Sequence, residues 1–186
     1  MGAAMEAALR ALEEGELVVY PTDTLYGLAA RADDPSALRR LFRAKHRPPG
    51  QPVSVAVSSW AELEPLADLL PSHRSFLRRH VPGPVTALLP PSSRARHRLS
   101  GLIANSGCLG VRIPDHPVAR EFARRAGPIT ATSANRHGEP TASSLAGVRS
   151  QLGRSVAVYL GGGPPPSGRP SKIVDLTGVR VRARGR

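Results

Sequence analysis

Two polar segments of the chain carry side chains that are suited to binding an anion. The first is Tyr20-Pro-Thr-Asp-Thr-Leu-Tyr-Gly-Leu28, in which a hydroxyl-rich turn follows a short apolar run. The second is Lys45-His-Arg-Pro48, which follows a segment with apolar residues at helical spacing. Cations beside hydroxyl groups can bind and neutralise an anionic ligand. Alternatively, Lys45 and Arg47 only complement the dipole at a helix C-terminus, and the local sequence supports the two interpretations about equally.

Lys45 is expected to point towards the protein interior. Asp34 as N-cap and Pro35 in the first turn predict the start of a helix. Its apolar stripe contains Leu38 and Leu41, and Lys45 continues that stripe because it lies seven residues after Leu38. The chain has 26 basic residues, of which only Lys45 and Lys172 are lysines. A retained lysine in an arginine-rich chain hints that a compact ammonium group is needed at Lys45.

A third polar segment, Ser133-Ala-Asn135, follows a predicted strand at residues 129–132. The turn at residues 22–26 likewise follows a predicted strand at residues 18–20. Ligands collect beyond the carboxyl ends of strands in sheets covered by helices, so we expect the two segments to contribute to one site. Lys45 and Arg47 would add cations to this site. The combined set suits charge neutralisation in phosphoryl or adenylyl transfer, with a metal held mainly by phosphates. It consists of the cations Lys45 and Arg47, the hydroxyls of Thr22, Thr24, Tyr26 and Ser133, and the amide of Asn135.

Signatures of several other chemistries are absent from the sequence. It contains no GxSxG nucleophile motif, no GxxxxGK[ST] phosphate loop, no HExxH motif and no CxxC pair, so no metal site is predicted. Cys108 is the only cysteine, which excludes an internal disulfide, and it is expected to be a small buried residue. The glycine- and proline-rich loop at residues 161–168 opens no helix and is expected to be a surface crossover or a mobile flap.

Alternating strands and helices predict one α/β domain over residues 1–186, with a twisted mixed β-sheet flanked by helices. Helices are expected over the first fourteen residues, after Asp34, after Ser58, from Pro71, after Asp115 and after Ser143. Strands are expected at 18–20, 52–57, 85–89, 109–113, 129–132 and 156–160, with a closing hairpin of 173–176 and 179–181. Residues 92–101, with Arg94, Arg96 and Arg98, are expected to be a mobile basic loop.

The formal net charge of +12 implies an anionic partner, either a nucleotide, a nucleic acid or both. Aromatic residues make up 4% of the chain, which argues against an RNA platform built on base stacking. The basic loop is either a merely solvated segment or a contact for nucleic acid. The N-terminal segment is not expected to be a signal peptide, and no apolar run is long enough to cross a membrane. We therefore expect a cytoplasmic protein with no membrane partner.

From about Leu17 to its C-terminus the sequence resembles the Sua5/YrdC/YciO family. The resemblance is carried by six stretches in the family's order, namely Pro21-Thr-Asp-Thr-Leu-Tyr-Gly-Leu28, Lys45-His-Arg-Pro-Pro-Gly-Gln-Pro52, Pro82-Gly-Pro-Val-Thr86, Val111-Arg-Ile-Pro-Asp115, Ser133-Ala-Asn135 and Pro170-Ser-Lys-Ile-Val-Asp-Leu176. It implies a YrdC-like fold, a twisted α/β sheet with a basic concave face. Because the chain ends at Arg186, it is similar to the shorter YrdC type without an extra C-terminal domain.

The activity that this resemblance implies is L-threonylcarbamoyladenylate synthesis, a nucleotidyl transfer. Its substrates would be L-threonine, bicarbonate and ATP with Mg²⁺, and it would release pyrophosphate. The product would be used by a separate transferase complex for the t6A37 modification of tRNA. Two alternatives remain: a non-catalytic protein that binds tRNA or double-stranded RNA, and a YciO-like paralogue with a different activity.

The resemblance also implies roles for individual residues. Lys45 and Arg47 would be catalytic and would neutralise the threonine carboxylate and the ATP phosphates, with Mg²⁺ bridging phosphate oxygens. Thr22 and Tyr26 would contact threonine. The nucleotide would be bound by Ser133, Asn135, Arg112 and Ser171.

Two positions depart from the family pattern. Ser171-Lys172 stands where the family usually has Ser-Thr, and Val181-Arg-Ala-Arg-Gly185 only loosely matches a near-terminal arginine motif. The roles of Lys172, Arg182 and Arg184 are therefore left open.

Overall fold

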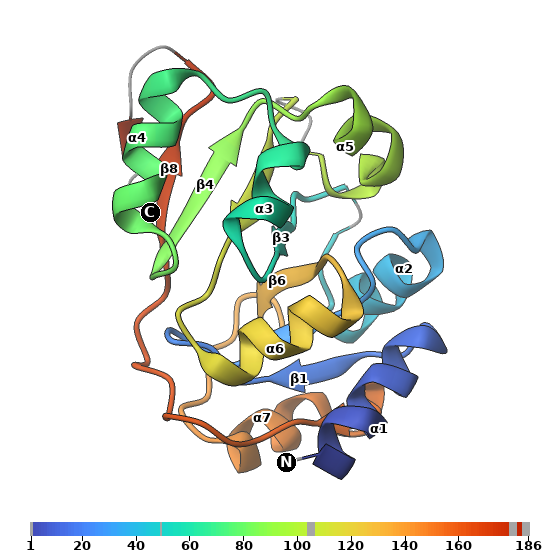
Figure 1. The fold of residues 1–186 in the computed structure, drawn as a ribbon. Coiled ribbons are helices and arrows are strands. Elements are labelled where there is room, and N and C mark those ends of the chain that lie inside the picture. Colours follow the sequence, from blue (N-terminus) through green and yellow to red (C-terminus); the bar gives the residue numbers. More distant parts are fainter. Residues whose placement is uncertain (1, 49, 104–106, 179–181, 184–186) are drawn as a thin grey trace.

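A strongly twisted mixed β-sheet forms the centre of the computed structural model, which describes residues 2–48, 50–103, 107–178 and 182–183 (Figure 1). In the described residues the strand order is β7-β1-β2-β6-β3-β5-β4-β8-β9. The strands are β1 (Val18–Tyr20), β2 (Gly27–Ala29), β3 (Ser54–Ala56), β4 (Val85–Leu89), β5 (Leu109–Arg112), β6 (Ile129–Ser133), β7 (Val158–Tyr159), β8 (Lys172–Asp175) and β9 (Arg182–Ala183). The predicted α/β class with a mixed sheet is confirmed.

Two pairings in this sheet bring distant polar segments together. Strand β2 is antiparallel to both β1 and β6, and this register sets Gly27 opposite Ser133. The turn that connects β1 to β2 therefore ends beside the end of β6. At the other end of the sheet, β8 runs parallel to β4 and sets Ile173 opposite Thr86.

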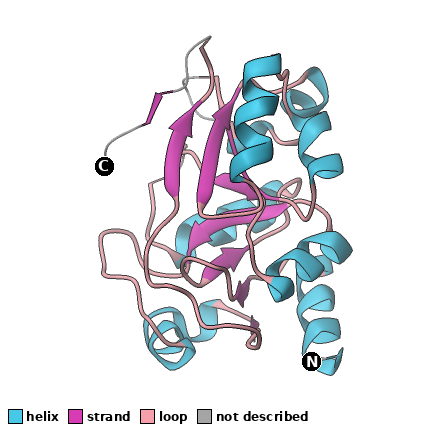
Figure 2. Cartoon of the chain, turned by 60° about the vertical axis from the view of Figure 1, so that its left-hand side comes forward, coloured by secondary structure: helices cyan, strands magenta, loops and turns pink. Residues whose placement is uncertain are grey.

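Helices cover both faces of the strand layer (Figure 2). They are α1 (Gly2–Glu13), α2 (Pro35–Ala44), α3 (Trp60–Leu63), α4 (Pro71–His80), α5 (Ser93–Arg98), α6 (Pro117–Ala126) and α7 (Leu145–Leu152), with short 3₁₀ turns at Glu64–Leu66, Ser100–Leu102 and Gly153–Ser155. Among the described residues, no helix combines the length and the apolar character needed to cross a membrane.

Successive residues of β1 belong to two different clusters of buried side chains. Val18 and Tyr20 pack with α1 and α6, whereas Val19 belongs to a larger cluster that includes residues of α2, α4 and α7. This alternation follows from the two-residue period of a strand, which directs neighbouring side chains to opposite faces of the sheet. Cys108 is buried as expected.

The start of α2 follows the local sequence closely. The Asp34 carboxylate accepts hydrogen bonds from the backbone N–H groups of Ser36 at 2.7 Å and Ala37 at 3.3 Å, and Pro35 occupies the first turn. These bonds satisfy N–H groups that have no partner within the helix. The helix ends at Ala44, so the C-cap residue is Lys45.

The prediction of a basic loop at residues 92–101 was wrong, because most of this segment is helical. The Ser92 hydroxyl accepts the Ala95 N–H at 3.2 Å and caps α5. Ala95 and Leu99 are both buried, and they lie one helical turn apart on the side that faces the core. Arg98 forms an ion pair with Asp33 at 3.1 Å. The serine cap and the burial of Ala95 and Leu99 therefore order a segment whose composition suggested a loop.

Other differences are smaller. Strand β2 was not predicted, because Gly27–Ala29 is too short to show a two-residue pattern. Three predicted N-caps were wrong by one position, since the structure has Ser59, His116 and Ser144 at these places. The closing hairpin pairs β8 with β9 in antiparallel fashion, and the predicted second strand at 179–181 lies outside the described residues.

Candidate functional site

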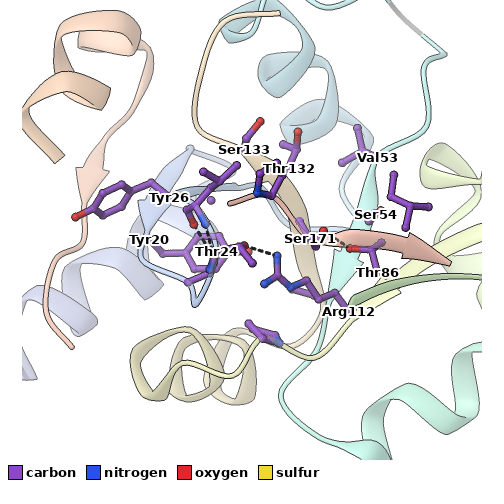
Figure 3. A pocket seen from close by; sticks show the side chains of 18 of the residues that line it. Tyr20, Thr24, Tyr26, Val53, Ser54, Thr86, Arg112, Thr132, Ser133 and Ser171 are labelled. Carbon is purple, nitrogen blue, oxygen red and sulfur yellow. Dashed lines mark hydrogen bonds between the residues drawn. The ribbon is translucent and has the colours of Figure 1, made fainter. Parts of the chain in front are cut away.

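A cleft of about 280 Å³ lies where the β1–β2 turn meets the strands in the middle of the sheet and the start of β8 (Figure 3). Among the described residues, two arginines line it, Arg47 and Arg112. Its other polar lining consists mainly of hydroxyl groups, from Thr22, Thr24, Tyr26, Ser54, Thr86, Thr132, Ser133 and Ser171. No carboxylate is found among the described residues that line this cleft. The cleft therefore offers arginine side chains and hydroxyl groups to an anionic ligand.

The Thr22 hydroxyl organises the turn at the cleft's edge. Its oxygen accepts the backbone N–H groups of Thr24 at 3.1 Å and Leu25 at 3.2 Å, and it donates to the Leu25 carbonyl at 2.6 Å. Thr22 is thus largely committed to the turn conformation. The turn is joined to the β6 end through Tyr26, whose carbonyl accepts the Ala134 N–H at 2.8 Å.

Gly27 permits close packing beneath this turn. A Cβ atom at Gly27 would lie 2.6 Å from the ring of Tyr20, which real side chains do not tolerate. Tyr20 is fully buried, and its hydroxyl donates to the Thr130 carbonyl at 3.2 Å. Burial raises the pKa of the Tyr20 phenol above its ordinary value, so the group stays protonated and is unsuited to act as a base.

Arg112 connects β5 to the same turn. It donates to the Thr24 hydroxyl at 2.7 Å and to the Asp23 carboxylate at 2.6 Å, and its side chain is 9% exposed. Figure 3 shows its guanidinium reaching towards Thr24. The Arg112 Nε group and the second Asp23 carboxylate oxygen are both buried without a protein partner. The structure therefore sets Arg112 against the turn residues, whereas the sequence resemblance grouped it with the nucleotide contacts.

Lys45 points inward, as predicted, and is only 2% exposed. Its ammonium group donates to the carbonyl oxygen of Ser133, to the carbonyl oxygen of Asn135 at 2.7 Å and to the Asn135 side-chain oxygen at 3.4 Å. Lys45 does not line the cleft itself. Its ammonium group binds the segment that carries Ser133 on the side away from the cleft.

Asn135 completes this support. Its side-chain oxygen accepts the Ser133 hydroxyl at 2.6 Å, and its amide nitrogen donates to the carbonyls of Glu139 at 2.6 Å and Arg136 at 3.1 Å. The four residues that the sequence paired across a site thus do come together. Arg47 and Ser133 line the cleft, while Lys45 and Asn135 lie directly behind it.

Arg47 is held at the cleft by its own connecting segment. Its guanidinium donates to the Gln51 side-chain oxygen at 3.0 Å and to the Pro52 carbonyl at 2.9 Å. Partial burial lowers the pKa of Arg47. The pKa of the Lys45 ammonium is lowered from 10.5 to about 8, mainly by burial and to a lesser extent by repulsion from Arg47.

The remaining wall comes from β4 and β8. The hydroxyls of Thr86 and Ser171 lie 2.8 Å apart, and both residues line the cleft together with Ile173. Side chains alternate along a strand, so Lys172 lies on the opposite face from Ser171 and Ile173. It is exposed and does not line the cleft. Arg182 begins β9, and Arg184 lies outside the described residues.

Sequence reasoning included Thr24 among the site hydroxyls, but it missed three other cleft residues, Ser54, Thr86 and Thr132. Only Thr86 lies within a stretch that carries the family resemblance, and none of the three has a distinctive local environment in the sequence. Thr24 is hydrogen-bonded to Arg112, and Thr86 lies beside the start of β8 because β8 pairs with β4.

The pKa of Lys45 leads to a prediction about pH. The ammonium should lose its proton near pH 8, so the positive charge behind Ser133 is present below that pH and is lost above it. Between about pH 8 and 10.5 the unfolded chain binds more protons at this residue than the folded chain. This residue's contribution to the free energy of unfolding should therefore rise with pH across that window.

NMR spectra of protein labelled at lysine can test this directly, because the chain has only two lysines. We expect one side-chain resonance to titrate with a midpoint of about pH 8 and to be missing from a Lys45→Arg variant. A midpoint for Lys45 at the ordinary lysine value of 10.5 would contradict the prediction.

This chain matches known proteins along nearly its whole length. The family model for Sua5/YciO/YrdC, described as "Telomere recombination", matches residues 10–184. A protein of Chromohalobacter salexigens named threonylcarbamoyl-AMP synthase is 41% identical over 171 residues, which cover 91% of this chain and 90% of that protein.

Solved structures give the same relationship. The crystal structure of P. abyssi Sua5 complexed with L-threonine has a TM-score of 0.86 and 32% sequence identity over 96% of this chain. The match covers 52% of the Sua5 chain, so the present chain spans about half the length of that protein. E. coli YciO superposes with a TM-score of 0.87 over 98% of this chain and 88% of its own, at 22% identity, which shows a shared fold.

Proposed function

Because the chain belongs to the Sua5/YciO/YrdC family, we propose that it is a threonylcarbamoyl-AMP synthase. Its substrates would be L-threonine, bicarbonate and ATP with Mg²⁺, and its second product would be pyrophosphate. The observation that carries the proposal is the pair of guanidinium groups, from Arg47 and Arg112, that line one hydroxyl-rich cleft. The reaction brings a carbamate and a triphosphate together, and cations at their meeting point offset the repulsion between these anions.

The chemistry requires two bond-forming steps. The threonine amine first combines with bicarbonate to give a carbamate, with loss of water. A carbamate oxygen then attacks the α-phosphorus of ATP, the bond between that phosphorus and the bridging oxygen breaks, and pyrophosphate leaves. Neither step needs a nucleophile from the protein, so positioning and charge neutralisation are the expected contributions of this chain.

The threonine side of the site is proposed at the β1–β2 turn. Thr22 shapes this turn, Tyr26 lies beside it, and both line the cleft. Arg112 is hydrogen-bonded to Thr24 of the same turn, and from there it can face either the threonine carboxylate or a phosphate.

The nucleotide side is proposed along β6 and the start of β8, where Ser133 and Ser171 present hydroxyl groups. Arg47 would bind the phosphates directly. Lys45 and Asn135 would act from behind the wall, because their polar atoms hold the Ser133 segment in place.

Mg²⁺ is proposed to arrive with ATP. The described residues contain no group of three or more His, Cys, Asp or Glu side chains that could hold a metal ion. The lining of the cleft is also without carboxylates in the part of the chain that the structure describes. This supports a Mg²⁺ ion coordinated mainly by phosphate oxygens and water, as is common for Mg²⁺ in nucleotide sites. The product would then pass to a separate transferase complex for t6A formation on tRNA.

The deciding experiment measures pyrophosphate release. The protein should release pyrophosphate only when L-threonine, bicarbonate and Mg-ATP are all present, and mass spectrometry should detect the threonylcarbamoyl adenylate. Replacing Arg47 with alanine should lower kcat/KM by about 100-fold, because a cation that faces the phosphates is lost. Arg79→Ala, which removes an exposed arginine of α4, is the matched control and should retain normal activity.

Folded protein that releases no pyrophosphate in response to threonine would overturn this function. RNA binding that falls steeply with salt and is unaffected by threonine would then favour the non-catalytic alternative.

A further inference from the structure

The loop that joins β7 to β8 crosses the molecule beside the cleft, and we call residues 161–171 the strap. In Figure 1 it runs from the lower part of the molecule up to β8. At its start, the Leu160 N–H donates to the Val19 carbonyl at 2.8 Å, and at its end the Lys172 N–H donates to the Pro84 carbonyl at 2.8 Å. Much of the strap is exposed, and its composition suggests a mobile flap. The structure instead fixes it at two points between these ends.

The first fixed point is His116, which is 2% exposed. Its Nδ1 atom accepts the backbone N–H of Ala119 at 3.4 Å and caps α6. Since that nitrogen must be unprotonated to accept, the proton lies on Nε2, which donates to the Pro164 carbonyl at 3.0 Å. Gly163 fits against the ring, because a Cβ atom there would lie 2.6 Å from the His116 Cε1 atom and the residue has φ of +72°.

The second fixed point is the β1–β2 turn. The Ser167 N–H donates to the Asp23 carbonyl at 3.2 Å, and the Gly168 N–H donates to the Thr24 carbonyl at 2.8 Å. The strap therefore contacts the backbone of the same two residues whose side chains bind Arg112.

These contacts close a ring of three segments, which we call the clasp. The strap binds the turn, and the turn binds Arg112. Arg112 is the last residue of β5, four residues before His116, the N-cap of α6. His116 then binds the strap and completes the ring. Pro170 and Ser171 at the end of the strap line the cleft, so the position of the strap helps to define the cleft wall.

We propose that His116 is a positioning residue, which holds the strap against the β1–β2 turn and so keeps Thr24, Arg112 and Ser171 arranged for substrate binding. The inference rests on the proposed function for its kinetic consequence. A strap ordered before binding lowers the conformational entropy that substrates would otherwise have to overcome. Release of the strap should therefore raise KM for threonine by about tenfold and change kcat much less.

The chain contains a matched control for this test. His73 is also 2% exposed, its Nδ1 accepts the Leu70 N–H at 3.3 Å, and its Nε2 lies 3.1 Å from the Gly178 carbonyl. It lies in the first turn of α4, where its ring accepts a backbone N–H at the helix start and contacts a distant carbonyl, as the ring of His116 does at α6, but neither His73 nor Gly178 lines the cleft. His116→Ala and His73→Ala lose the same kinds of contact.

Two further variants separate the clasp from helix stability. Asparagine is a favourable N-cap, so His116→Asn should retain the α6 cap, but its shorter side chain should not reach Pro164. Gly163→Ala keeps His116 and its cap, and displaces the strap because the added Cβ would meet the ring. Both variants should remain folded.

The direct measurement is hydrogen exchange at the Ser167 and Gly168 amides, which the clasp protects. We expect His116→Ala, His116→Asn and Gly163→Ala to speed this exchange at least about tenfold and to raise KM for threonine, whereas His73→Ala should do neither. Unchanged exchange in His116→Asn and Gly163→Ala would overturn the proposal, as would an equal rise of KM in His73→Ala. If wild-type protein releases no pyrophosphate, the proposed function fails, and the exchange rates still decide whether His116 holds the strap.

Discussion

Replacing Lys45 with alanine is expected to abolish threonine-dependent pyrophosphate release and to lower the free energy of unfolding by about 3 kcal/mol. The ammonium group is buried and donates to the carbonyl oxygens of Ser133 and Asn135. Alanine would leave these buried oxygens without their donor and would create a cavity at the end of α2. The Ser133 hydroxyl would then lose its fixed position in the cleft wall.

The chain's other lysine provides the control for this substitution. Lys172 is exposed on the face of β8 that points away from the cleft, so Lys172→Ala should change neither activity nor unfolding midpoint appreciably. Urea denaturation and pyrophosphate release should be measured on both variants. Normal activity in Lys45→Ala would show that the support behind Ser133 is not required for the reaction.

The second large effect is expected for Arg112→Gln. This change removes the cation from a nearly buried ion pair with Asp23, at an N–O distance of 2.6 Å, and leaves the carboxylate without its partner. Loss of one member of a buried pair typically costs about 3–5 kcal/mol. Threonine-dependent activity should fall at least about 100-fold, because the cleft loses a guanidinium group and the turn loses its support.

A double variant separates charge burial from catalysis. Asp23→Asn combined with Arg112→Gln removes both charges, so it should recover much of the stability lost in Arg112→Gln, while activity should remain low. As a surface comparison, Arg98→Ala breaks the exposed pair with Asp33 and should cost only about 0.2–1 kcal/mol. If Arg98→Ala and Arg112→Gln were equally destabilising in urea, the structural role assigned to Arg112 would be wrong.

Local features of the fold could be predicted because they depend on residues only a few positions apart. Asp34 and Pro35 specify the start of α2, and the spacing of Leu38 and Lys45 fixes the inward direction of the lysine. The same kind of reasoning failed for α5, where a polar composition concealed a serine cap and two buried positions. A short helix of this kind is decided by packing more than by propensity.

The site was predicted in outline, and its internal arrangement was not. The polar segments around Thr22, Lys45 and Ser133 were expected to meet, and they do. That Lys45 lies behind the cleft, and that Arg112 binds the β1–β2 turn, could not be read from spacing. Both facts depend on the direction in which side chains from different elements, the end of α2 and the end of β5, converge.

The sequence by itself determined the succession of strands and helices apart from β2 and α5, the inward lysine and the six stretches that reveal the family. Only the tertiary structure decided which of the polar groups face a ligand and which support one another. The reason is that β2 pairs with β6 and β8 pairs with β4 across long separations in the chain. Contacts between such distant segments are set by the packing of the whole sheet, and no local pattern of residues records them.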